Sequence, residues 1–172
     1  KNMPIIKQLF WGSKGTFRNT FIDPKSRIKE LRIRQNMLQL HQKIALFTLG
    51  CMTYQYNLGL EMDNGYDVKM KDKHLQIGYV TFGSYMTAAG LSIFSPPAIK
   101  YSNKKLSSMK IHRYLAMIHF VGMVVQPWLG YQTSVAGIEG RVDDRQYYLD
   151  IHKQIGTITF STYILSFITT LL

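Results

Sequence analysis

Four of the five histidines each stand at the start of a long stretch that carries few charges. The residue four positions later is always alanine or glycine, so the same helix face stays small one turn further on. Imidazole is a favoured ligand of haem iron, and a flat macrocycle held by it would lie against the backbone at that point. The pairs are His41 with Ala45, His74 with Gly78, His112 with Ala116 and His152 with Gly156.

Each stretch is about 20 residues long, roughly what a helix needs to cross a bilayer. No charged residue occurs in 75–99 or in 114–138, and none follows Lys153. A water-facing bundle would show polar stripes on its outer faces. We therefore predict an all-α, integral membrane four-helix bundle over residues 38–172, preceded by a basic extramembrane arm, residues 1–37.

Two local features refine this prediction. Residues 5–11 have the apolar character of a short helix that ends before Gly12. The run from Arg27 to Leu40 has helical periodicity, and we expect it to continue into the first stretch without a break.

The net charge of +11 is unevenly distributed. Residues 1–40 hold nine Lys or Arg against two acids, and 95–111 hold four Lys and no acid. The connections 61–73 and 132–151 each hold four acids. This asymmetry is typical of the positive-inside rule. It predicts a multi-pass protein of a prokaryotic inner membrane or an organellar membrane, with both termini on the inner side, and it argues against a nucleic-acid partner.

The four stretches also form two similar pairs, which indicates a repeated helical hairpin. Aligned on their histidines, the first and third stretches share six residues, and the second and fourth share seven. The matches are His41/His112, Ala45/Ala116, Met52/Met123, Gln55/Gln126, Leu58/Leu129 and Gly59/Gly130, then His74/His152, Gln76/Gln154, Ile77/Ile155, Gly78/Gly156, Thr81/Thr159, Phe82/Phe160 and Tyr85/Tyr163.

Topology then pairs the histidines by depth. His41 and His112 begin outward-running stretches, whereas His74 and His152 begin inward-running ones. Two bis-histidine haems b follow, one per side, or one haem if a pair has become structural. Interface anchoring or ligation of chlorophyll magnesium are alternative roles for these histidines. His119, two turns after His112, is either a core histidine or a group that assists a bound macrocycle.

The HxxxA pattern on stretches one and three and the HxxxG pattern on two and four resemble the cytochrome b561 / ferric-reductase-like transmembrane superfamily. The resemblance covers about residues 38–172 and implies the same pairs, His41 with His112 and His74 with His152. The chain lacks the flanking spans of the six-helix, ascorbate-dependent members. It also has no GxGxxG, so NADPH or flavin chemistry would come from another protein.

The sequence thus favours a b-type cytochrome that carries electrons across or within a membrane. Its expected partners are the lipid bilayer, other membrane protein subunits and a quinol or small redox donor or acceptor. Whether it is an enzyme or an electron-transfer protein stays open. The alternative is a structural accessory subunit of a large respiratory or photosynthetic complex, with one haem or none.

Overall fold

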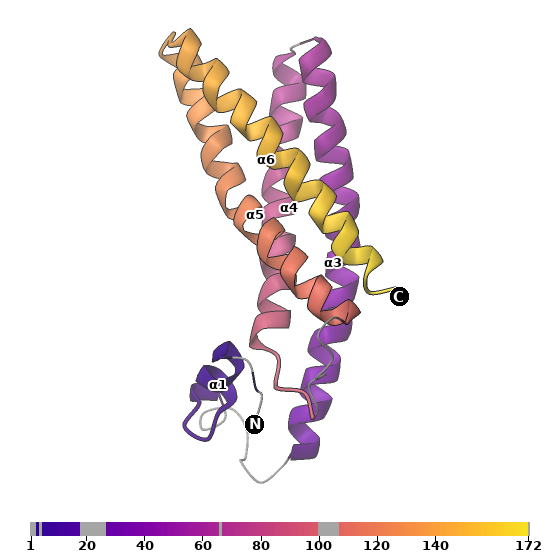
Figure 1. Ribbon diagram of the computed structural model, residues 1–172. Helices are drawn as coiled ribbons and strands as arrows, with labels where there is room; N and C mark the ends of the chain where they lie inside the picture. Colours follow the sequence, from indigo (N-terminus) through magenta and orange to yellow (C-terminus); the bar gives the residue numbers. More distant parts are fainter. Residues whose placement is uncertain (1–2, 4, 18–26, 66, 100–106, 172) are drawn as a thin grey trace. The chain divides into compact units, whose positions relative to one another are not determined.

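The computed structural model describes residues 3, 5–17, 27–65, 67–99 and 107–171, and their regular structure is entirely helical (Figure 1). The helices are α1 (Ile5–Trp11), α3 (Arg27–Asn64), α4 (Val68–Phe94), α5 (Ser108–Ile138) and α6 (Val142–Ile168). The short helix at 5–11 and the unbroken helix from Arg27 were both expected from the sequence. The long helices form two hairpins, α3 with α4 and α5 with α6.

The prediction of an integral membrane protein is wrong. In the part of the chain that the structure describes, no helix has both the length and the apolarity that a bilayer crossing requires. The error came from counting charges, because an uncharged stretch is not the same as an apolar one. Residues 41–60, for example, include two Gln, two Thr, two Tyr and an Asn, and unpaired polar groups are costly in hydrocarbon. The predictions of a multi-pass membrane location and of both termini on the inner side are therefore wrong as well.

The chain divides into two compact units. The first contains residues 1–48 and 81–103, and the second contains 49–80 and 104–172. The boundary lies within α3 and α4. The first unit therefore contains the beginning of α3 and the end of α4, and the second contains the end of α3 and the beginning of α4.

In the first unit, α1 caps the carboxyl end of α4. The ammonium of Lys7 donates to the backbone carbonyls of Ser92 and Ile93 at 2.9 and 3.0 Å. The indole N–H of Trp11, which is buried, donates to the carbonyl of Phe94 at 2.9 Å. The last carbonyls of a helix have no partner within it, and a cation there also complements the helix dipole. These bonds therefore fix α1 to this end of the hairpin.

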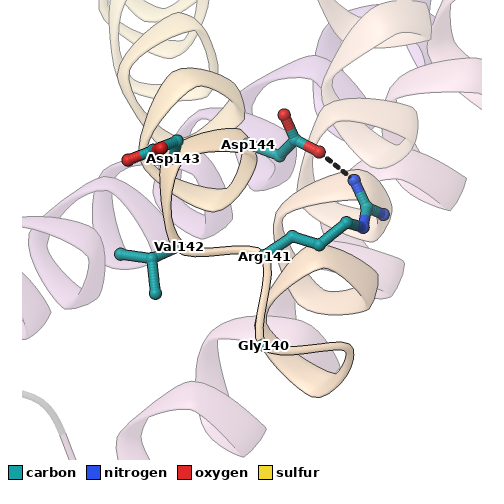
Figure 2. A pocket seen from close by; sticks show the side chains of 5 residues that line it. All are labelled: Gly140, Arg141, Val142, Asp143 and Asp144. Carbon is teal, nitrogen blue, oxygen red and sulfur yellow. Dashed lines mark hydrogen bonds and ion pairs between the residues drawn. The ribbon is translucent and has the colours of Figure 1, made fainter.

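In the second unit, α5 and α6 pack side by side and are joined by a short turn at Gly140, whose φ is +72° (Figure 1). Glycine adopts this left-handed conformation without a steric penalty. Arg141 follows and pairs with the carboxylate of Asp144 (Figure 2). It also pairs with the carboxylate of Glu139, so the turn carries its own ion pairs. Pro127 lies within α5 without ending that helix.

Aromatic and hydroxyl contacts join the two hairpins within this unit. The rings of Tyr56 on α3 and Phe160 on α6 stack with centroids 4.9 Å apart. The hydroxyl of Tyr56 also lies 3.3 Å from that of Thr157. The four helix segments are thereby held around a shared interior, which contains two of the predicted ligand histidines.

Candidate haem site

His74 on α4 and His152 on α6 face each other in the second unit. Their ring centroids are 6.3 Å apart, and the ring planes are inclined by 65°. A metal–imidazole bond is about 2.0 Å long, and the remaining distance to each ring centre brings the centroids of two axial imidazoles to roughly 6 Å apart. The centroid separation of the two rings is close to that value, and their inclination is that of an edge-to-face contact. This is the pair that the sequence predicted for the outer haem.

The backbone orients His74 for ligation. Its Nδ1 lies 3.1 Å from the carbonyl oxygen of Gln55 on α3. A carbonyl can only accept a hydrogen bond, so it places the proton on Nδ1 and leaves the lone pair of Nε2 for a metal. This outer bond is the usual support of a metal-ligating histidine.

His152 carries the unsatisfied polar atom of the site. Its Nδ1 is buried and has no partner of normal hydrogen-bond geometry among the described residues, although an interaction with the Gln126 backbone opposes the lowering of the pKa of this ring. Its backbone carbonyl, in contrast, accepts a bond of 2.9 Å from the side-chain amide of Gln126. Iron bound at Nε2 of this ring would leave Nδ1 unpaired, so the buried Nδ1 does not by itself indicate a metal.

Burial keeps both imidazoles neutral. Desolvation lowers the pKa of His74, against a smaller opposing effect of its bond to Gln55. Desolvation, followed by the proximity of His74, lowers the pKa of His152 to about 4. Only the neutral imidazole has a lone pair to give to a metal, so at neutral pH the pair is in the state that ligation requires.

A glycine stands beside each imidazole. A Cβ placed on Gly59 would lie 3.6 Å from Cε1 of His74, and one placed on Gly130 would lie 3.5 Å from Cε1 of His152. These glycines were matched in the sequence alignment of the two hairpins, and here they make matching contacts. A methyl group at either position would make ordinary van der Waals contact with the ring, so both glycines lie directly beside an imidazole.

The glycines four residues after the histidines face glutamine side chains. A Cβ on Gly78 would lie 2.8 Å from Nε2 of Gln55, and one on Gly156 would lie 3.3 Å from Nε2 of Gln126. The space that the sequence reserves for a macrocycle is thus taken up by two long amide side chains. These two side chains would have to move for a macrocycle to lie there, whereas the two neutral imidazoles are donors that suit haem iron.

The other two histidines share the orientation of His74. Nδ1 of His41 lies 2.8 Å from the carbonyl oxygen of Ala88, and Nδ1 of His112 lies 3.0 Å from that of Ser166. Ala88 and Ser166 are matched positions, 14 residues after His74 and His152. His41 belongs to the first unit and His112 to the second, so their pairing stays a prediction. Ala45 and Ala116, one turn on, are both half-buried.

His119 packs in the core of the second unit. Its ring contacts that of Tyr163 on α6, with centroids 4.9 Å apart, and 6% of the residue is exposed. Burial, then the proximity of His112, lowers its pKa to about 4. Of the two roles left open by the sequence, this packing favours a core histidine.

The buried His119 predicts a loss of stability in acid. Its pKa is about 4 in the folded chain, against 6.5 for an unperturbed histidine, so between these values the unfolded chain binds a proton that the folded chain excludes. Stability therefore falls as pH falls through this window. We expect His119 to account for about 2 kcal/mol of the loss between pH 7 and pH 5. Urea unfolding of the haem-free protein and of His119→Gln at both pH values measures the difference; equal pH slopes would contradict it.

Comparisons with protein families, with curated proteins and with solved structures gave no match. The resemblance to the cytochrome b561 / ferric-reductase-like superfamily thus stays a prediction. Among the described residues, no three or more His, Cys, Asp or Glu side chains come together as a metal-binding group. The facing pair of His74 and His152 is thus considered as two axial ligands.

Proposed function

We propose that the chain is a b-type cytochrome that binds haem between His74 and His152 and transfers single electrons. The observation that carries the proposal is the 6.3 Å separation of the two ring centroids. The bond from Nδ1 of His74 to the carbonyl oxygen of Gln55, which leaves Nε2 for iron, supports it.

The arrangement of the two ligands favours electron transfer over catalysis on a substrate. Haem iron supplies reversible one-electron chemistry. His74 and His152 would both hold the haem iron, which would leave no open position at the metal for a substrate. The protein's part is to hold the two rings, keep them neutral and limit the access of water.

The electron donor and acceptor, a quinol or another small redox partner, would come from outside the chain, because the sequence has no GxGxxG fingerprint for a dinucleotide.

A visible spectrum of the purified full chain tests the proposal. We expect a reduced-minus-oxidised difference spectrum of a low-spin b-type haem, with the haem quantified as the pyridine haemochrome. Two haems per chain would support both pairs, and one haem would support a single pair. A chain reconstituted with haemin that shows no such spectrum would contradict the assignment.

A further inference from the structure

Two lysines lie close to the facing histidines, and their partners differ. Lys153, next to His152 on α6, forms an ion pair with Asp63 on α3 at 2.5 Å. Lys71 on α4 donates to the hydroxyl of Ser134 on α5 at 3.2 Å. Lys71 is half-buried, and in the described residues no carboxylate lies within ion-pair distance of it. The charge of Lys153 is thus balanced by a carboxylate of the protein, whereas the charge of Lys71 is not.

The bond between Lys71 and Ser134 lies about one helical turn from the histidine pair. Lys71 precedes His74 by three residues, so both share a face of α4. Ser134 follows Gly130 by four residues on α5, and Gly130 is the glycine beside the ring of His152. A molecule held between the two imidazoles would therefore have one edge towards this lysine and hydroxyl.

Haem carries two propionates on one edge, and a carboxylate that leaves water needs a cation or hydrogen-bond donors. We infer that Lys71 and Ser134 bind a propionate of the haem held by His74 and His152. This inference rests on the proposed function. The ammonium supplies the charge, and the hydroxyl supplies a second donor once the direct bond between the two side chains opens. This contact would set the orientation of the haem, with its propionate edge toward Lys71 and Ser134.

The test compares haemin with its dimethyl ester, in which both propionates are uncharged. The titrated proteins are the full-length wild type, Lys71→Met and Ser134→Ala, with Lys69→Met as the matched control because Lys69 is an exposed lysine two residues away on α4. Binding is followed by Soret absorbance, and release by transfer to a haem-scavenging protein.

We expect Lys71→Met to weaken haemin binding about tenfold, the usual size of a charge-assisted hydrogen bond. Ser134→Ala is expected to have a smaller effect, and Lys69→Met none. The Soret position stays unchanged, because the axial ligands remain. With the dimethyl ester, the wild type and Lys71→Met should bind equally well.

The failures of this inference and of the proposed function differ. Haemin binding by Lys71→Met as tight as that of Lys69→Met would overturn the inference alone, as would an equal loss of affinity for haemin and for the ester. A wild type without a low-spin haem spectrum would overturn the proposed function and the inference with it.

Discussion

If haem binds between α4 and α6 as proposed, we expect His74→Ala and His152→Ala each to lose it. The rings stand 6.3 Å apart, and an alanine at either position leaves iron with one axial ligand and an open face. Loss of a supporting group around a metal ligand already costs 10- to 100-fold in affinity, so loss of the ligand itself should cost at least about 100-fold. Haem content per chain and the low-spin spectrum are the measurements.

Two controls give this experiment its specificity. His119→Gln replaces another buried histidine of the same unit, and we expect it to retain the haem between His74 and His152. Adding imidazole to His152→Ala should restore part of the low-spin spectrum, because a free imidazole can occupy the vacated side. Haem content unchanged in both alanine variants would refute the ligand assignment.

The second predicted site is tested in the same way. If His41 and His112 bind their own haem, His112→Ala should remove that haem and leave the one at His152 in place. The two variants should then lose different bands of the difference spectrum. This distinguishes two independent sites from one haem that depends on the whole fold.

Much of the helical architecture could be predicted from the sequence, because it depends on local periodicity. The unbroken helix through Arg27–Asn64 and the short helix at Ile5–Trp11 were expected. So was the facing of His74 and His152, since two antiparallel hairpins place the starts of the second and fourth stretches at the same end. Matched contacts at Gly59 and Gly130 agree with the repeat seen in the sequence.

The membrane assignment failed because charge and apolarity are different properties. The long uncharged stretches also expose large apolar side chains, among them Tyr79 and Tyr131, which are 70% and 65% exposed. When only charges are considered, a helix face with such exposed aromatic residues looks like a face in contact with lipid. The mean hydropathy of a helix also counts its hydroxyl, amide and imidazole groups, and these keep the described helices below the level of a span.

Other features of the site depend on packing between helices and were not accessible from sequence. The bond of Lys71 to Ser134 joins residues 63 positions apart. The ion pair of Lys153 with Asp63 joins α6 to α3 and likewise depends on the packing of the two hairpins. Spacing within one helix predicts which residues share a face, but it does not predict which side chain meets them from the next helix.

Gly122 is where the packing of α5 against α6 is most sensitive to a single methyl group. A Cβ at this buried position would lie 1.9 Å from Oγ1 of Thr159 and 3.0 Å from its Cβ. Thr159 is itself buried, and its hydroxyl donates to the carbonyl of Ile155 at 2.6 Å. The side chain therefore has little freedom to move away, so the helices themselves would have to separate.

We expect Gly122→Ala to destabilise the protein by about 1–3 kcal/mol, the usual cost of overpacking a core. Gly50→Ala is the matched control, because that glycine lies within α3 with nothing within 4 Å of an added Cβ; there the same change should stabilise by about 0.5–1 kcal/mol. Urea unfolding measures both. Adding Thr159→Ala, which removes the crowding hydroxyl, should recover much of the loss at Gly122, whereas Thr159→Ser, which keeps it, should not. A double-mutant cycle without coupling between positions 122 and 159 would contradict the contact as the cause.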